Sequence, residues 1–348
     1  MIRKNTREIC VGNVKIGGGA PVAVQSMCNT DTRDVKKTLA QIEELASVGC
    51  KIARLAVIDK SAAHAIGEIA EHSPLPIVAD IHFDYKLALE AAAAGASKIR
   101  INPGNIGGDD RVHAVVRACT EKNIPIRIGV NGGSLERDIL AKYGVTARGM
   151  VESAKYHIAL LNKFDFEDIC VSVKSSSVPM TVEAYRLLSE EVPYPLHVGV
   201  TEAGTARMGK IKSAVGIGSL LLDGIGDTIR VSLTDSPVLE VETAYDILRS
   251  LGLENNSPEL VSCPTCGRCM INLIEIAKEV EKRLLSINKP IKVAVMGCVV
   301  NGPGEASEAD IGIAGGKNVG LLFRHGEIVK KVPMCDIVDE LMSMAEEL

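Results

Sequence analysis

The chain alternates short β-branched runs with helix-like segments from residue 20 to residue 235, and this alternation limits its fold more than any other feature. The runs are Val22–Met27, Lys51–Val57, Pro76–Phe83, Ser97–Pro103, Pro125–Asn131, Ile169–Ser175, Pro195–Glu202 and Thr228–Leu233. Segments between them, such as Asp34–Ser47 and Val182–Glu190, carry apolar residues at helical spacing. Eight strand–helix units in roughly 250 residues have the size of a closed parallel barrel. We therefore expect an α/β fold with a (β/α)₈ TIM-type barrel over residues 1–252. The alternative is an open doubly wound sheet, which the lack of a Gly-x-Gly-x-x-Gly motif after the first strand disfavours.

Polar residues stand at the carboxyl ends of these runs, where active sites lie in barrels of this kind. Several of them are two or four positions apart within a run, which puts both side chains on one face of a strand. The candidates are Arg54, Asp80, His82, Arg100, Asn102, Arg127, Asn131, Lys174, Glu202, Arg230 and Ser232. We expect these side chains to converge on one mouth of the barrel.

Charge at this predicted mouth is unbalanced. Five candidates are cations, and only Asp80 and Glu202 are acids. Structural ion pairs inside the barrel explain one or two such residues, but unpaired buried charge is costly, and five cations exceed what two acids neutralise. The guanidinium group of Arg and the ammonium group of Lys both bind phosphate oxygens well. The excess of positive charge therefore predicts a site for a small, highly anionic ligand.

Four of the ten cysteines gather behind residues 252–258, a segment of turn and linker composition. The clustered cysteines are Cys263, Cys266, Cys269 and Cys298. In a reducing compartment such clustering favours metal or redox chemistry over disulfides. A zinc ribbon would need a second Cys-x-x-Cys or a Cys/His pair, whereas a 4Fe–4S cluster accepts three Cys and a different fourth ligand. Glu305 is either that exchangeable ligand or a solvated loop acid, and the residues alone leave both open.

Residues 259–348 alternate helix-like and strand-like runs, which predicts a small second domain of α/β (α+β) type. Helices are expected over Met270–Leu285 and Asp336–Glu346, and strands over Ile291–Gly297, Asp310–Ala314 and Val319–Phe323. Cys298 then follows a strand directly, at a strand-to-loop turn. We expect the iron–sulfur cluster in this domain.

Composition excludes several functional classes. The net charge is −5 and aromatic residues make up 3% of the chain, with no Trp, so the chain is a poor general nucleic-acid binder. No stretch approaches the ~20 apolar residues of a membrane span, and the N-terminus has no signal-peptide pattern. We expect a cytoplasmic protein with neither nucleic-acid nor membrane partners.

Short motifs along nearly the whole chain resemble those of one enzyme family. They are Val24-Gln-Ser-Met27, Ala79-Asp-Ile-His-Phe-Asp-Tyr85, Arg100-Ile-Asn-Pro-Gly-Asn-Ile-Gly107, Arg127-Ile-Gly-Val-Asn131, Thr201-Glu-Ala-Gly204, Ser262-Cys-Pro-Thr-Cys266 and Gly297-Cys-Val-Val-Asn-Gly-Pro-Gly-Glu305. They look like the motifs of the 4-hydroxy-3-methylbut-2-enyl diphosphate synthases of the methylerythritol phosphate isoprenoid pathway. The last motif is highly specific, and the length matches the two-domain bacterial form of the family.

This resemblance implies a reaction. The substrate would be 2-C-methyl-D-erythritol 2,4-cyclodiphosphate, whose ring is opened with loss of a hydroxyl and gain of two electrons to give 4-hydroxy-3-methylbut-2-enyl diphosphate. The electrons would pass from reduced flavodoxin or ferredoxin through a 4Fe–4S cluster. The family is a homodimer in which the cluster domain of one chain caps the barrel of the other, and a polar linker permits that arrangement.

The resemblance also assigns residues. Cluster ligands fall on Cys263, Cys266, Cys298 and Glu305. Substrate-binding residues fall on Arg54, Arg100, Arg127, Lys174 and Ser232, with Asn102 and Asn131 beside them and Asn301 reaching the substrate from the cluster side. The family's acid/base residue falls on Glu202, and Asp80 with His82 is a second group able to move protons near the leaving hydroxyl.

Cys269 departs from the family pattern, because it completes a ferredoxin-like Cys-x-x-Cys-x-x-Cys run. Four cysteine ligands would fill every iron and leave no place for substrate. Since Glu305 stands in an intact motif, we expect Cys269 to be a bystander.

Two other functions stay open at the level of the residues. The first is a non-redox barrel synthase, similar to dihydropteroate synthases, with a structural zinc in the tail; it would contain zinc and no iron. The second is an electron-transfer or assembly protein whose barrel binds nothing, for which Arg100 and Lys174 would be dispensable.

Overall fold

The computed structural model of the protein describes residues 3–348 apart from 255, 288, 299–303, 305 and 317. The chain divides into two compact units, Met1–Leu251 and Gly252–Leu348. In the described part of the chain, no helix combines the length and the apolar character that a membrane crossing requires.

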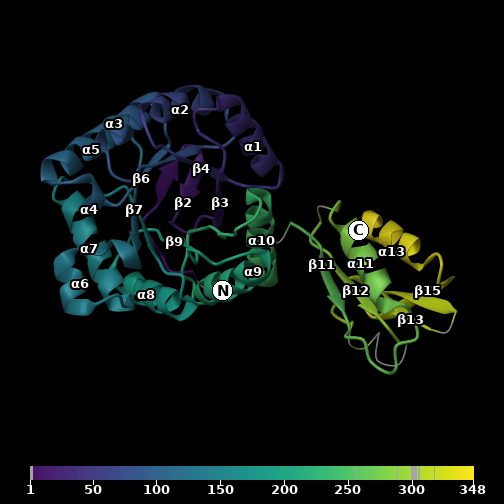
Figure 1. The fold of residues 1–348 in the computed structure, drawn as a ribbon. Coiled ribbons are helices and arrows are strands. Elements are labelled where there is room, and N and C mark those ends of the chain that lie inside the picture. The colour runs from purple at the N-terminus through teal and green to yellow at the C-terminus, as the bar shows by residue number, and fades with distance from the viewer. Residues whose placement is uncertain (1–2, 255, 288, 299–303, 305, 317) are drawn as a thin grey trace. The chain divides into compact units, whose positions relative to one another are not determined.

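The first unit is a parallel barrel (Figure 1). Its strands are β3 (Ala23–Met27), β4 (Ile52–Ala56), β5 (Ile77–Asp80), β6 (Lys98–Ile101), β7 (Ile126–Asn131), β8 (Ile169–Lys174), β9 (His197–Val198) and β10 (Thr228–Ile229). They are hydrogen-bonded in the order β8-β7-β6-β5-β4-β3-β10-β9, and a parallel bridge between Val171 and Leu196 joins β8 to β9. The predicted TIM-type barrel is therefore confirmed.

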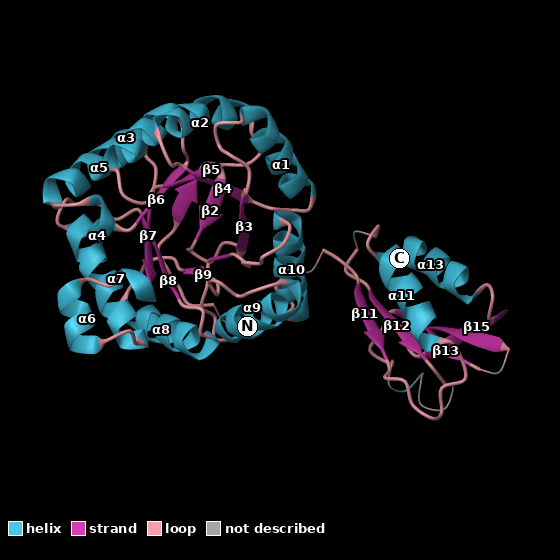
Figure 2. Ribbon diagram, in the orientation of Figure 1, coloured by secondary structure: helices cyan, strands magenta, loops and turns pink. Residues whose placement is uncertain are grey.

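Helices surround the sheet on its outer side (Figure 2). They are α1 (Val35–Ser47), α2 (Lys60–His72), α3 (Tyr85–Ala94), α4 (Pro103–Ile106), α5 (Asp109–Lys122), α6 (Arg137–Tyr143), α7 (Ala147–Asn162), α8 (Val178–Glu191), α9 (Ala206–Leu222) and α10 (Pro237–Ser250). Many begin at a residue whose side chain accepts a backbone N–H of the first turn, as Asp59 does before α2 and Ser177 does before α8. These caps set where each strand-to-helix loop ends, and so where the loops at the mouth lie.

A hairpin that the sequence analysis did not predict covers the amino ends of the barrel strands. It consists of β1 (Ile9–Val11) and β2 (Val14–Ile16), paired antiparallel. Its buried side chains form one apolar cluster with the lowest inward-facing residues of the barrel, including Ile52 and Val78. Because this end is filled with apolar side chains, the opposite mouth is the end that offers polar groups to a ligand.

The last two barrel strands are shorter than predicted. Of the predicted run Pro195–Glu202, only His197–Val198 is paired as a strand. Of the run Thr228–Leu233, only Thr228–Ile229 is paired. The backbone of Glu202, four residues past the end of β9, has φ +51°, in the left-handed region that extended strands do not adopt. Polar residues beyond these two strands therefore lie on irregular loops at the mouth.

The second unit contains a mixed sheet in the order β11-β12-β13-β14-β15. Its elements are β11 (Glu259–Ser262), α11 (Leu273–Leu284), β12 (Lys292–Met296), β13 (Ile311–Gly315), β14 (Val319–Arg324), β15 (Glu327–Pro333) and α13 (Ile337–Glu347). The three strands β11, β12 and β13 are parallel, and β14 and β15 continue the sheet antiparallel. This confirms a small mixed domain, to which the structure adds the two edge strands β11 and β15.

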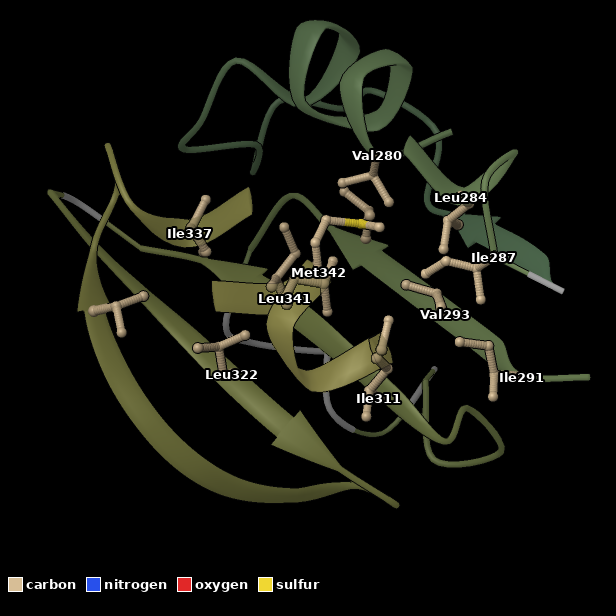
Figure 3. Close-up of a cluster of buried hydrophobic side chains, with 14 of the residues drawn as sticks. Val280, Leu284, Ile287, Ile291, Val293, Ile311, Leu322, Ile337, Leu341 and Met342 are labelled. Atoms are coloured by element: carbon tan, nitrogen blue, oxygen red, sulfur yellow. The ribbon is translucent and has the colours of Figure 1, made fainter. Parts of the chain in front are cut away.

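The helices α11 and α13 pack on the sheet through one apolar cluster. Figure 3 shows Val280 and Leu284 from α11 and Leu341 from α13 gathered around strand residues such as Val293 and Ile311. These side chains are almost wholly buried, and each fully buried aliphatic side chain contributes roughly 1.5–3 kcal/mol. The unit thus has a core of its own, on which the loops after β11 and β12 are built.

Candidate active site at the barrel mouth

Asp80 lies at the centre of a buried ion-pair group on β4, β5 and β6. Its Oδ2 is 2.6 Å from Nη2 of Arg54, its Oδ1 is 3.1 Å from Nη1 of Arg100, and only 1% of its side chain is exposed. The half-exposed His82 adds a third contact, with Nε2 3.4 Å from Oδ2. Burial opposes ionisation of Asp80, but Arg54, His82 and Arg100 outweigh it and hold the pKa of the carboxyl well below its usual range. The carboxylate is therefore ionised at neutral pH and orients both guanidinium groups.

Arg127 lies next to this group with part of its guanidinium unpaired. Arg100 and Arg127 are direct register partners on β6 and β7, so both side chains point into the barrel. Arg127 is 2% exposed, and no described residue gives its Nε or Nη1 a hydrogen-bond partner. Burial, together with the positive charges of Arg54 and Arg100, lowers the pKa of Arg127 well below its ordinary value. Unpaired buried donors of this kind indicate a place for an anion.

Lys174 reaches the same region from β8. Asn131 and Lys174 are register partners, four residues along the strands from Arg127 and therefore two inward-facing layers nearer the mouth. Burial and the surrounding guanidinium groups, Arg127 foremost, lower the pKa of Lys174 well below its ordinary value. An anion bound between these cations would relieve the repulsion that lowers both pKa values.

Two inward-facing glycines make room for these cations. A Cβ added at Gly129 would lie 2.5 Å from Nε of Arg100, and one added at Gly199 would lie 2.7 Å from Nζ of Lys174. The Cβ at Gly199 would also lie 2.4 Å from the carbonyl oxygen of Arg230, which is backbone and cannot move aside easily. Glycine is thus required at both positions for Arg100 and Lys174 to take their places. The sequence signal is a glycine inside a strand, where it commonly marks a close approach.

Arg230 is held by an acid that the sequence analysis missed. Glu240, on α10 and 4% exposed, lies with Oε1 3.3 Å from Nη2 of Arg230. Its carboxylate also accepts hydrogen bonds from the hydroxyl of Ser26, at 3.0 Å, and from the backbone N–H of Leu233, at 2.9 Å. The local pattern gave no signal for Glu240, because an acid in the first turn of a helix usually faces solvent. The mouth therefore contains one more acid than the predicted two.

Asn102 and Asn131 are joined through Ser134, in the short helical turn η1 (Gly132–Ser134). Nδ2 of Asn102 donates to Oγ of Ser134 at 3.1 Å, and that hydroxyl donates to the carbonyl oxygen of Asn131 at 3.1 Å. Oδ1 of Asn102 accepts the backbone N–H of Gly104 at 3.1 Å and so caps α4. The loops after β6 and β7 are thereby tied together beside the cations.

The remaining barrel candidates lie on the irregular loops. Glu202 is exposed and has left-handed backbone, and Ser232 is half-buried after β10. Within the part of the chain that the structure describes, neither side chain forms a hydrogen bond or ion pair with the group around Asp80. Sequence reasoning also missed Lys98, which is fully buried one layer below Arg100, and burial lowers its pKa to about 8.

The cysteine positions lie at one edge of the second unit's sheet. Cys263 follows β11 and Cys298 follows β12, its parallel neighbour, and the backbone N–H of Gly297 donates to Sγ of Cys263 at 3.2 Å. Cys266 is exposed, and the backbone N–H of Arg268 lowers its thiol pKa. Among the described residues, no group of three or more His, Cys, Asp or Glu side chains is arranged to hold a metal ion. Asn301 and Glu305 lie outside the described residues.

The donor chemistry at this edge nevertheless suits an iron–sulfur cluster. Thiolates are the ligands such clusters use, and N–H groups directed at the sulfurs are a common way of stabilising them. Cys269 differs from the other three. Its thiol donates to the carbonyl oxygen of Ile271 at 3.3 Å, whereas its packing against the apolar cluster of the unit is shared with Cys263.

Comparison with known proteins finds the same two-part organisation. The model of the GcpE TIM-barrel domain matches residues 6–245, and that of the GcpE protein C-terminal domain matches residues 259–347. A protein of Ruminiclostridium cellulolyticum is 60% identical over 347 residues, 99% of this chain and 98% of its own. A protein of Geobacter sulfurreducens is 58% identical over 348 residues, covering 100% of this chain and 99% of its own. Both are named 4-hydroxy-3-methylbut-2-en-1-yl diphosphate synthase (flavodoxin).

Two solved structures each match about 70% of this chain. Type I 3-dehydroquinate dehydratase from Clostridium difficile has a TM-score of 0.53 at 13% identity and covers 71% of this chain and 98% of its own. Dihydropteroate synthase from Yersinia pestis has a TM-score of 0.51 at 13% identity and covers 70% of this chain and 98% of its own. At such identities the likeness shows a shared barrel fold and says nothing of the reaction.

Proposed function

This chain belongs to the GcpE family of 4-hydroxy-3-methylbut-2-en-1-yl diphosphate synthases, and from that membership we infer its reaction. It is an oxidoreductase of isoprenoid precursor biosynthesis that converts 2-C-methyl-D-erythritol 2,4-cyclodiphosphate to 4-hydroxy-3-methylbut-2-enyl diphosphate with two electrons. The observation that carries this conclusion is 58–60% identity over the full length of both units. The dihydropteroate synthase-like alternative has only a distant fold match in its favour.

We propose that the cations of the barrel mouth hold the two phosphate groups. Arg127 has unpaired buried donors, and Lys174 lies two layers nearer the mouth among the guanidinium groups. Asp80 and Glu240 orient the neighbouring arginines rather than neutralise the whole group. Positive charge placed in advance stabilises the negative charge that develops as the cyclic diphosphate opens. Asn102, Asn131 and Ser232 complete the substrate contacts in this proposal, with Asn301 approaching from the second unit.

We propose Glu202 as the acid/base residue of the reaction. Its left-handed backbone, four residues beyond β9, departs from the conformation most residues adopt, and such departures concentrate at functional sites. Asp80 with His82 is the second candidate, and here His82 is the group that moves the proton, because Asp80 stays ionised. A carboxylate held so far below its usual pKa is a poor proton donor near neutral pH.

For the second unit we propose a 4Fe–4S cluster held by Cys263, Cys266, Cys298 and Glu305. When bound, the cluster supplies the electrons and Lewis acidity that protein side chains lack. Cys269 is assigned no ligand role, which its hydrogen bond to the carbonyl oxygen of Ile271 supports.

The partners of the enzyme follow from the same proposal. The electron donor is reduced flavodoxin or ferredoxin, and relatives carry flavodoxin in their name. We further propose a cytoplasmic homodimer in which the cluster domain of one chain caps the barrel of the other. Such closure would exclude water from the reacting substrate.

The decisive experiment is turnover of the cyclodiphosphate by anaerobically purified protein with a reduced one-electron donor. We expect brown protein, bleached by reductant, that forms the linear diphosphate. An Arg127→Met variant should keep the colour but lose turnover at low substrate concentration. Colourless protein with one zinc per chain, or iron-loaded protein with no product, would exclude the proposed function.

A further inference from the structure

An imidazole–carboxylate pair beside the turn after β6 has a fully buried imidazole, a carboxylate that is 21% exposed, and no part in the reaction described above. His157, on α7, is fully buried, and its Nε2 is 2.6 Å from Oε1 of Glu136, which precedes α6. Burial opposes ionisation of Glu136, but the contact with His157 outweighs it and lowers the carboxyl pKa. Burying the imidazole beside a carboxylate costs solvation, so stability alone is a weak reason for such a pair.

The pair lies directly against the turn that follows β6. A Cβ added at Gly104, in α4, would be 3.1 Å from Oε1 of Glu136 and 3.1 Å from Cε1 of His157. The same point is 3.4 Å from Oδ1 of Asn102, which accepts the N–H of Gly104. The pair and Asn102 thus face one glycine from two sides, and a shift of this turn would move the asparagine with it.

A second connection runs through the chain itself. Glu136 stands two residues after Ser134, whose hydroxyl accepts from Asn102 and donates to the carbonyl oxygen of Asn131. The segment 132–136 is therefore attached to α7 at one end and to both asparagines at the other. Displacement of Glu136 would loosen the side chain of Asn102 and the strand end that carries Asn131.

We propose that Glu136 and His157 are positioning residues that hold Asn102 and Asn131 in the geometry needed to bind the diphosphate substrate. The inference rests on the proposed function. Neither side chain touches substrate, so losing the pair weakens binding in the ground state and the transition state alike. Such a loss raises KM and leaves kcat largely unchanged.

The test uses steady-state kinetics of the iron-loaded enzyme. His157→Leu and Glu136→Gln should each raise KM for the cyclodiphosphate about tenfold and change kcat less than threefold, with iron content unaltered. His157→Gln, whose amide nitrogen can still donate to Glu136, should recover part of the affinity. The double variant should be no worse than either single one, because the two residues act as one unit.

Ile158→Ala is the matched control, since Ile158 is buried next to His157 on the same helix. It should lower the melting temperature without raising KM. Unchanged KM in the pair variants, or an equal rise in the control, would overturn the inference. If His157→Leu does not fold, Glu136→Gln alone decides. Calorimetric binding of inorganic diphosphate repeats the comparison without turnover, so failure of the proposed function is told apart from failure of the pair.

Discussion

Replacing Asp80 by Asn tests whether one carboxylate organises the mouth. The substitution keeps the shape but removes the charge that faces Arg54 at 2.6 Å and Arg100 at 3.1 Å, in surroundings where Asp80 is 1% exposed. Removing one partner of a buried ion pair costs roughly 3–5 kcal/mol. We take about 3 kcal/mol, because the amide oxygen still accepts one hydrogen bond. At about 2–4 °C per kcal/mol for a unit of this size, the melting temperature should fall by about 6–12 °C.

The assay is thermal unfolding at pH 7, followed by circular dichroism, with and without inorganic diphosphate. The anion should stabilise the Asp80→Asn protein more than the wild type, because it supplies negative charge to guanidinium groups that no longer face the Asp80 carboxylate. Asp31→Asn is the control, since Asp31 also pairs with an arginine, Arg33, but on the exposed surface, and its melting temperature should change little. Wild-type-like melting of the Asp80 variant, or equal stabilisation of both proteins by diphosphate, would refute the reasoning.

Wild type and Asp80→Asn should also differ in how their stability depends on pH, in a direction that the pKa of Asp80 sets. The pKa of Asp80 is lower in the folded protein than in the unfolded chain, where it is about 3.9. Its ionisation therefore contributes stability that is complete above that value and is lost as the pH falls towards the folded pKa. The difference in melting temperature between wild type and Asp80→Asn should stay constant down to about pH 4 and shrink below it.

Three further substitutions test other parts of the proposal. Lys174→Met should remove the ammonium without adding a Cβ against the backbone of Arg230, and losing one charged hydrogen bond of about 1.5–3 kcal/mol should raise KM roughly 10- to 100-fold in steady-state turnover; an unchanged KM would show that Lys174 does not bind substrate. Glu240→Gln should leave Arg230 without its buried counter-charge and lower the melting temperature by about 4–8 °C, for a cost of about 2 kcal/mol; a melting temperature equal to wild type would count against this pairing. Cys269→Ser should retain its iron by metal analysis and its turnover within about twofold, and loss of iron would make Cys269 a ligand.

The sequence alone was enough to predict the barrel and the gathering of its cations. Local periodicity predicts the strand and helix segments, and the parallel strands of a barrel bring their carboxyl ends to one mouth. Arg100 and Arg127 could therefore be placed together before any coordinates were known. The last two strands were predicted too long, because β-branched composition does not reveal where the ladder between neighbouring strands stops.

Contacts between residues far apart in the chain decide how each cation is held. Glu240 contacts Arg230 and Ser26 only because the barrel closes. The hairpin β1–β2 covers the amino ends of the strands only once those strands are arranged around it. His157 and Glu136 meet because α7 folds back across the turn after β6. Local composition sets which elements form, whereas burial, register and the pairing of charges depend on which elements become neighbours, and only the tertiary structure determines that.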